Sequence, residues 1–305
     1  MTRNSNREYR NINGILLLKK PSGITSNDAL QKIKKLFYAR KAGHTGSLDK
    51  PATGMLPIFF GEATKFTSYL INADKYYYTR CQLGAETTTG DAAGEITGTN
   101  DVPTLIEKPL TGILSEFKGD IAQVPPMYSA LKHKGQRLYK LAYKGIEVER
   151  KKRLVRIYDI KLINFTKDQL EIELHCSKGT YVRTLVEDIG RRIGCGAHVH
   201  QLIRTRVGDF AEDEMWTIDE LIKLSETRFS NLLDVLLPVD SVVNGMPEVT
   251  LTHSSSSYIT NGQSISVPNA PSKGMLRMYN QNHDFLGIGE VLKDGRIAPR
   301  RLVNL

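Results

Sequence analysis

The chain has 305 residues, of which 40% are hydrophobic and 25% are charged, and this is enough for one large globular domain plus a small one. Three cysteines exclude a disulfide framework, and no apolar run approaches the roughly 20 residues of a membrane span. We therefore expect a cytoplasmic protein without membrane contact. Lys and Arg number 42 against 33 Asp and Glu, and the net charge of +9 favours a polyanionic partner, although a protein that is basic throughout has the same composition.

The N-terminal segment begins with a polar and charged stretch, and we expect residues 1–12 to form a flexible basic tail. The apolar run from Gly14 to Lys19 predicts a short buried strand. Ser26 is a suitable N-cap for a helix that ends near Phe37, because apolar residues recur at helical spacing after it.

Residues 43–57 contain three glycines and two prolines, which favour a shaped loop over a helix or a central strand. Asp49 is the only carboxylate in this loop, and a rigid loop that presents one acid is a common way to build an active site. The alternative is that Asp49 caps a turn before Pro51. The segment has neither the Gly-Lys-Ser/Thr ending of a P-loop nor the G-x-G-x-x-G spacing, so we expect no nucleotide cofactor.

The elements after this loop alternate between helix and strand. Residues 63–71 and 110–117 have helical patterns, residues 75–83 form a predicted strand, and residues 87–101 form a polar loop.

Residues 124–153 differ in character from the rest of the chain. The stretch from Lys132 to Arg153 holds nine Lys or Arg and two Glu, so it carries a net charge of +7. Tyr139 and Tyr143 lie one helical turn apart within it. Basic side chains interleaved with aromatic rings favour a nucleic-acid partner, and the alternative is a solvated helix face.

The next segment predicts a hairpin over 154–164 and 169–176, a helix over 180–193, a strand over 197–206, and helices over 218–224 and 229–236. Arg183 lies in the first turn of a predicted helix, where a cation opposes the helix dipole. We therefore expect Arg183 to pair with a carboxylate or a phosphate. Cys195, His198 and His200 have loose spacing and no fourth ligand, so we expect no metal site.

From residue 247 to 305, short apolar segments are separated by turn residues such as Ser254–Ser257 and Asp294–Gly295. This pattern predicts a small all-β domain with a basic edge.

Several short motifs are distributed over nearly the whole chain. They are Gly43-His44-Thr45-Gly46-Ser47-Leu48-Asp49, Gly61-Glu62-Ala63-Thr64-Lys65, Asp74-Lys75-Tyr76-Tyr77, residues 125–132, Ser177-Lys178-Gly179-Thr180-Tyr181-Val182-Arg183, residues 194–198 and residues 295–302. Together and in this order, these motifs resemble those of the TruB family, the bacterial tRNA pseudouridine-55 synthases.

The resemblance implies an α/β (α+β) pseudouridine-synthase fold, with a large mixed, mainly antiparallel sheet flanked by helices. It implies a catalytic domain over 13–246, an RNA-gripping thumb over 124–153 and a PUA-like β domain over 247–305. The implied reaction isomerises uridine 55 in the T-arm loop of tRNA by base flipping and formation of a C–C glycosidic bond. It implies no cofactor and no metal, and we expect a monomer.

By the same resemblance, Asp49 is the essential carboxylate, which either attacks C1′ or removes a ribose proton. Arg183 pairs with Asp49, and Tyr77 stacks on the flipped base and is the candidate acceptor of its C5 proton. His44 fills space near the displaced base, and Leu202 lines the pocket. The implied RNA contacts are Lys132, Lys134, Arg137, Lys140, Lys151, Lys152 and Arg153.

One position departs from the family pattern. Lys50-Pro51 stands where the family usually has Pro-Leu, so the proline restricts Lys50 rather than Asp49. Two other functions remain open: a tRNA-folding chaperone, whose activity can coexist with the chemistry, and a related synthase that acts on another uridine or another RNA.

Overall fold

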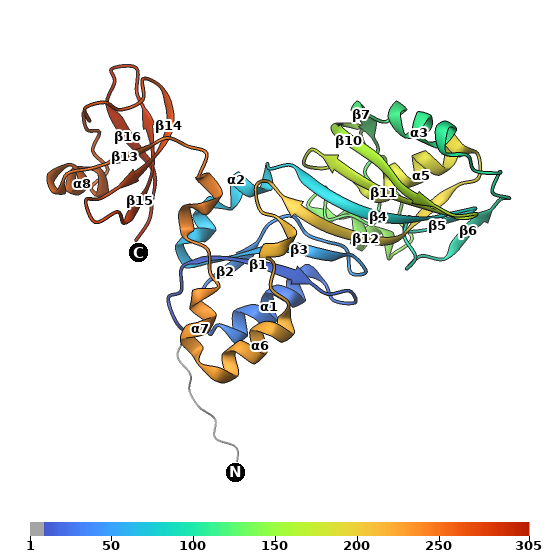
Figure 1. The fold of residues 1–305 in the computed structure, drawn as a ribbon, viewed down its shortest axis with the longest axis horizontal. Helices are drawn as coiled ribbons and strands as arrows, with labels where there is room; N and C mark the ends of the chain where they lie inside the picture. The colour runs from blue at the N-terminus through green and yellow to red at the C-terminus, as the bar shows by residue number, and fades with distance from the viewer. Residues whose placement is uncertain (1–8, 305) are drawn as a thin grey trace, which may run out of the picture.

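The computed structural model describes residues 9–304, and a large sheet forms its centre (Figure 1). Within these residues the sheet has eight strands, in the order β1-β3-β12-β4-β11-β10-β7, with β2 added beside β3. All neighbours are antiparallel except β12 and β3, so the predicted mixed, mainly antiparallel sheet is confirmed. The strands are β1 (Gly14–Lys20), β2 (Ala42–His44), β3 (Thr53–Phe60), β4 (Lys75–Leu83), β7 (Gly119–Gln123), β10 (Arg153–Phe165), β11 (Gln169–Cys176) and β12 (Ala197–Val207).

Helices cover the two halves of this sheet separately (Figure 1). Helices α3 and α5 pack on β10 and β12, over a core that includes Ile172, Leu185 and Ile189. Helices α1, α6 and α7 enclose a second core with β1 and β3, around Leu16 and Ile33. The helical elements are α1 (Ser26–Leu36), η1 (Gly61–Phe66), α2 (Thr67–Ile71), α3 (Glu107–Glu116), α5 (Val182–Ile193), η2 (Glu212–Glu214), α6 (Ile218–Thr227), α7 (Phe229–Asp234) and η3 (Val239–Val243).

The cap of helix α1 differs from the prediction. Thr25, not Ser26, is the N-cap: its hydroxyl accepts from the amide of Asp28, and the Asp28 carboxylate accepts from the amide of Thr25. Ser26 is buried, and its side chain bonds both the N–H and the C=O of Leu48. The hydroxyl predicted to start a helix therefore holds the loop that carries Asp49.

The predicted loop at 43–57 is shorter in the structure, because β3 begins at Thr53 and runs through Pro57. Thr53 and Gly54 pair with β12, whereas residues 58–60 pair with β2. Pro57 lies between these two pairings, where its carbonyl accepts from the amide of Thr45. A proline is tolerated there because that edge of the strand requires no N–H donor.

Two short hairpins project from the sheet. In the first, β5 (Ala85–Thr87) pairs with β6 (Ile96–Thr99), so the predicted polar loop at 87–101 contains a strand. The second belongs to the thumb, the name used below for residues 124–153. It consists of β8 (Lys132–His133), β9 (Gln136–Arg137) and helix α4 (Leu138–Ala142).

The C-terminal segment forms a separate sheet of β13 (Glu248–Thr250), β14 (Gly274–Tyr279), β15 (Phe285–Val291) and β16 (Ile297–Leu302). It is not all-β, because helix α8 (His253–Thr260) occupies the residues expected to form a turn. Thr252 caps α8 through the amide of Ser255, which explains how a serine run starts a helix. The ring of Phe285 lies 5.7 Å from that of Phe66, so this sheet packs against η1, in a buried cluster that also contains Phe59 of β3.

The predicted N-terminal tail falls partly on residues 1–8, which lie outside the described residues. Residues 9–12 of the predicted flexible tail are described, and two of them contact the body of the protein. The amide of Arg10 donates to the carbonyl of Tyr38, and Ile12 is buried. Among residues 9–304, no helix has the length and apolar character needed to cross a membrane.

Candidate active site

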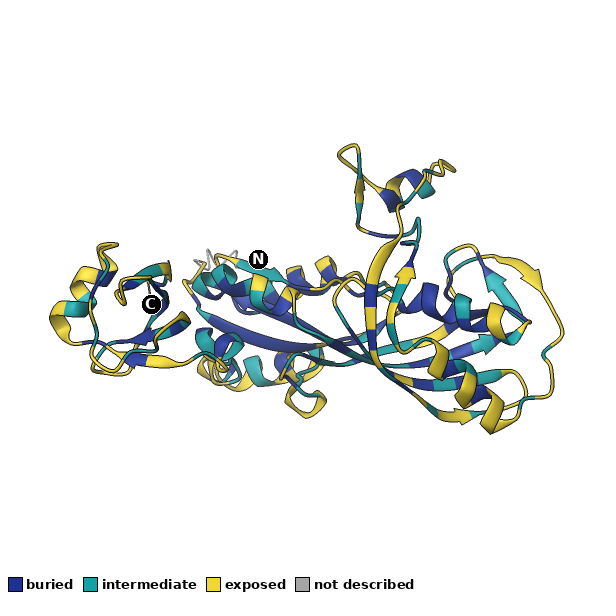
Figure 2. Cartoon of the chain, turned by 90° about the horizontal axis from the view of Figure 1, so that it is seen from above, coloured by how far each residue is buried: buried dark blue, intermediate teal, exposed yellow. Residues whose placement is uncertain are grey.

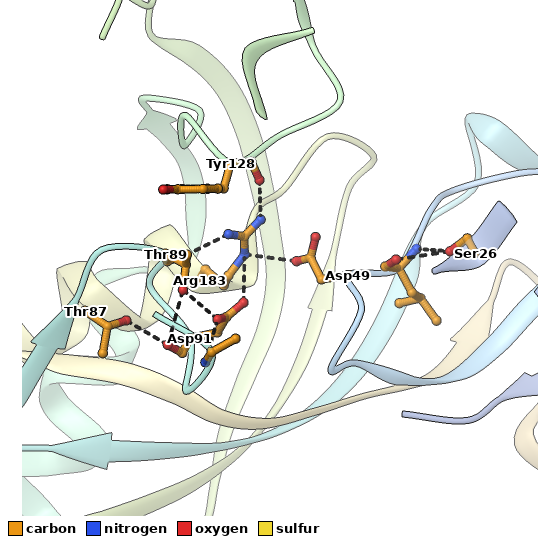
Figure 3. A network of polar contacts seen from close by, with 9 residues as sticks. Ser26, Asp49, Thr87, Thr89, Asp91, Tyr128 and Arg183 are labelled. Atoms are coloured by element: carbon orange, nitrogen blue, oxygen red, sulfur yellow. Dashed lines mark hydrogen bonds and ion pairs between the residues drawn. The ribbon is translucent and has the colours of Figure 1, made fainter. Parts of the chain in front are cut away.

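The loop between β2 and β3 places Asp49 against the first turn of helix α5 (Figure 3). Nε of Arg183 lies 2.9 Å from Oδ2 of Asp49. The Arg183 side chain is only 4% exposed, whereas that of Asp49 is 43% exposed and open to an incoming substrate. The Asp49 carboxylate therefore meets a buried cation instead of capping the turn before Pro51. The turn is closed by a bond from the Ala52 amide to the Asp49 carbonyl.

The guanidinium of Arg183 joins three segments of the chain. Its Nη1 donates to the carbonyl of Thr89 at 2.7 Å, and its Nη2 donates to the carbonyl of Tyr128 at 2.8 Å. A second carboxylate, that of Asp91, lies 4.0 Å from Nε and accepts from the hydroxyl of Thr89 (Figure 3). The planar fork of an arginine satisfies these directions together, which a lysine cannot do.

Lys20, at the end of β1, supports the loop from the opposite side. Its ammonium is fully buried and donates to the carbonyls of Pro21, Ile24 and Lys50. The amide of Gly23 also donates to the Lys50 carbonyl. The backbone next to Asp49 is therefore fixed by two donors, even though the proline lies one position later than in the family pattern.

Arg204, on β12, is buried at the other end of the loop. Its Nε donates to the carbonyl of Met55 at 2.7 Å, and its Nη2 donates to that of Gly46 at 2.6 Å. Gly46 has φ +61°, and a Cβ there would lie 3.2 Å from Nη1 of Arg204. The glycine therefore allows both the left-handed turn and the close approach of the guanidinium.

Burial and these cations set the charges of the site. Burial raises the pKa of Asp49, and the positive charges of Arg183 and Lys20 oppose that rise. Burial lowers the pKa of Lys20 to about 8. Burial, with the charge of Arg204, also lowers the pKa of His44, so its imidazole is neutral at pH 7. Burial raises the pKa of Tyr77, and Arg204 opposes that rise.

The other predicted site residues, Leu202, Tyr77 and His44, differ in how directly they contact Asp49 and Arg183. Leu202 lines a cavity of about 20 Å³ together with Asp49 and Arg183, which is room for about one water molecule. Tyr77 lies opposite Arg204 across the pair of strands β4 and β12, and the positive charge of Arg204 acts on His44. His44 does not bond Asp49, and among the described residues its buried Nδ1 has no hydrogen-bond partner.

Comparison with known proteins places this geometry in a family. The N-terminal domain of the TruB family pseudouridylate synthases matches residues 34–182. The C-terminal domain of tRNA pseudouridylate synthase B matches residues 183–244, and the C-terminal region of pseudouridine synthase II TruB matches residues 247–303. The chain belongs to the TruB family. It is therefore a pseudouridine synthase, and the predicted resemblance is confirmed.

Curated relatives extend over nearly the same length. A protein named tRNA pseudouridine synthase B from Nitrosococcus oceani is 53% identical over 294 residues, covering 96% of each chain. The protein of the same name from Coxiella burnetii is 50% identical over 295 residues, again covering 96% of each. In fold, the chain is similar to a crystal structure of a Cbf5-Nop10-Gar1 complex, with a TM-score of 0.72 and 24% identity over 95% of this chain and 84% of that one.

The predicted RNA contacts of this TruB family member lie on two parts of the thumb, which extends away from the body (Figure 2). Lys132, Arg137 and Lys140 share one groove of about 470 Å³, and Lys134 lies in the adjacent hairpin turn. Lys152 lines a second cleft, of about 560 Å³, between the base of the thumb and α5. Tyr128 and Thr89, whose carbonyls bind Arg183, line the same cleft. Lys151 is exposed beside it, and Arg153 begins β10.

The residues considered for a metal site are used otherwise. The Nδ1 of His198 lies 2.9 Å from the carbonyl of Ala85, and Cys195 is a buried thiol. Among residues 9–304, no group of three or more His, Cys, Asp or Glu side chains is arranged to hold a metal ion.

Sequence reasoning missed Lys20, Asp91 and Arg204. One signal for Arg204 was present: it lies two positions after Leu202 on a predicted strand, so both face the same side of the sheet. An arginine on an inward face requires buried partners. Lys20 gave no comparable signal, because Lys19-Lys20 looks like the polar end of a strand.

Proposed function

We propose that this enzyme converts uridine 55 in the T-arm loop of tRNA to pseudouridine, with Asp49 as the essential carboxylate. The observation that carries this proposal is the 2.9 Å pair between the accessible Asp49 carboxylate and the buried Arg183. The curated relatives named tRNA pseudouridine synthase B support tRNA as the substrate.

The reaction breaks the bond between N1 and C1′ of the uridine, turns the base and joins C5 to C1′. The C5 proton is released and N1 takes up a proton, so the product is an isomer of the substrate. Asp49 is required in its ionised form, whether it attacks C1′ or removes a ribose proton. Burial alone favours the protonated acid. Arg183 and Lys20 counter that tendency and so favour the ionised carboxylate that the reaction requires.

The target base must leave its loop to reach Asp49, because its reacting atoms are covered inside folded RNA. We propose that Tyr77 stacks on the displaced base. Burial raises the pKa of its phenol, and the positive charge of Arg204 opposes that rise, so Arg204 favours the phenolate form that can accept the C5 proton. His44 and Leu202 then act as neutral walls around the base, and the bonds of Arg204 keep the loop in place.

The RNA approaches along the thumb and the cleft at its base. Four cations of the thumb line the distal groove, which suits a phosphate backbone. The proximal cleft has balanced charge, because Glu147, Glu187 and Asp188 line it together with Arg150, Lys152 and Arg191. We further propose that the protein acts as a monomer in the cytoplasm, without a nucleotide cofactor. The divisions at residues 13, 124, 153 and 247 are proposed as its functional boundaries.

The test is release of tritium from tRNA that carries 5-tritiated uridine, followed by mapping of the modified position. The proposal predicts release and a single pseudouridine in the T-loop. Release that maps to another uridine or another RNA would contradict the substrate assignment. No release by the wild-type protein, with tRNA still bound and refolded, would favour the chaperone alternative.

A further inference from the structure

Helix α4 of the thumb and the turn that follows it carry two rows of side chains. Tyr139 and Tyr143 are one helical turn apart, and so are Lys140 and Lys144. The lysines line the basic groove of about 470 Å³, whose lining residues are Lys132, Gly135, Gln136, Arg137, Lys140 and Lys144. An aromatic row therefore runs directly beside a basic one.

Tyr143 is more exposed than any other aromatic residue in the described part of the chain, with 78% of its surface accessible. Its ring is nevertheless positioned. It makes T-shaped contacts with Tyr128 at 5.6 Å and 80°, and with Tyr139 at 6.3 Å and 79°. Two perpendicular neighbours restrict the orientation of the ring and leave most of its surface open, so it is prepared for a flat partner.

This aromatic cluster is connected to the catalytic carboxylate. The backbone carbonyl of Tyr128 accepts from Nη2 of Arg183, whose Nε pairs with Asp49 (Figure 3). Tyr128 and Arg183 therefore link Tyr143 to Asp49 through a series of direct contacts.

We propose that Tyr143 stacks on an unpaired base of the substrate RNA, while the lysine row holds the neighbouring phosphates. The chemistry of the partner follows from the two rows: cations spaced along a groove follow a phosphate backbone, and an open aromatic face takes the face of any unpaired base. Paired bases in a duplex do not offer that face. Tyr143 is thus a positioning residue, and this inference rests on the proposed function.

The experiment combines protein variants with abasic RNA. The probes are T-arm stem-loop RNAs in which one unpaired loop nucleotide at a time is replaced by an abasic site. Binding and single-turnover rates are measured for wild type, Tyr143→Ala and Tyr143→Phe. Tyr258→Ala serves as the matched control, because Tyr258 on helix α8 is also exposed, at 54%.

We expect Tyr143→Ala to weaken binding of the intact RNA about tenfold, since stacking of one base contributes on the order of that factor. Tyr143→Phe and Tyr258→Ala should stay within about twofold. For one of the abasic RNAs, wild type and Tyr143→Ala should bind with equal affinity. The position of that abasic site identifies the stacked base.

The proposal is overturned if Tyr143→Ala binds the intact RNA as well as wild type does. It is equally overturned if the loss persists with every abasic RNA, since the contact is then not with a loop base. Thermal unfolding of each variant separates these outcomes from a collapse of the thumb. Failure of the proposed function would be seen independently, as a wild-type protein that forms no pseudouridine in the intact stem-loop.

Discussion

The loop around Asp49 and the thumb use positive charge in opposite ways. At the loop, Lys20, Arg183 and Arg204 are buried, and their donors are used by carbonyls and by one carboxylate. On the thumb, Lys132, Arg137, Lys140 and Lys144 lie along an open groove and are available to an incoming anion. Buried cations fix a geometry for chemistry, whereas exposed cations attract a polyanion without fixing it. Substitutions in the two regions should therefore separate turnover from affinity.

The largest effect is expected from Arg183→Lys. A lysine cannot reproduce the three directions of the bonds to Asp49, Thr89 and Tyr128, and each lost charge-assisted bond costs about 1.5–3 kcal/mol. We expect the single-turnover rate to fall on the order of 100-fold, with tRNA affinity within about threefold. Arg191→Lys, on the exposed side of the same helix, is the control. A variant with unchanged kinetics would argue against the ion pair.

Arg204→Lys should reduce both stability and rate. The substitution leaves the buried carbonyl of Met55 or the partly buried carbonyl of Gly46 without its donor, and loss of a buried donor costs about 1–3 kcal/mol. We therefore expect the free energy of unfolding, measured by urea titration, to fall by about 2–4 kcal/mol. Arg206→Lys on the same strand, where the side chain is more accessible, should change it by less than about 1 kcal/mol. Equal effects at both positions would show that Arg204 does not hold the loop.

Neutralising Lys151, Lys152 and Arg153 together should affect affinity but not chemistry. Each lost phosphate contact removes about 0.7–0.9 from the slope of log Kd against log salt concentration, so the triple variant should lose about 2. The single-turnover rate at saturating tRNA should stay near wild type. The control removes Lys32, Lys35 and Lys223 from helices α1 and α6. An unchanged salt slope in the thumb variant would place the RNA elsewhere.

The smallest effect concerns pH. Because burial raises the pKa of Asp49, the ionised form is lost as pH falls through a value above the ordinary 3.9 or so of an aspartate. The rate should therefore have an acid limb above that value. Lys20→Gln removes a positive charge that lowers this pKa, so the limb should move to higher pH. A limb that stays in place would show that Lys20 only anchors the backbone.

The features that could be predicted from the sequence are those that appear as a local pattern of apolar or charged residues. Period-two alternation placed β4 at residues 75–83 and β11 at 169–176, because apolar side chains face one core on every second position. The cation cluster of the thumb was visible as local charge. The position of Arg183 in a first helical turn indicated a partner, and the structure supplies Asp49.

The remaining features depend on contacts between distant segments. Ser26 was assigned to a cap, but its hydroxyl is taken by Leu48, 22 positions away. Asp91 is buried next to Arg183 through the fold of a loop that has no regular pattern in sequence. A local pattern cannot reveal such partners, because they meet only when the sheet is assembled.

The most direct test of the account is Asp49→Asn, measured beside wild type for both tRNA binding and tritium release. The substitution keeps the shape of the side chain and removes its charge. The account predicts that tritium release is abolished while the Kd for tRNA stays within about tenfold of wild type, since the thumb is intact. Release near the wild-type rate would contradict the assignment of Asp49 as the essential carboxylate. If Asp49→Asn lost both tRNA binding and tritium release, that result would contradict the separation of chemistry from RNA binding.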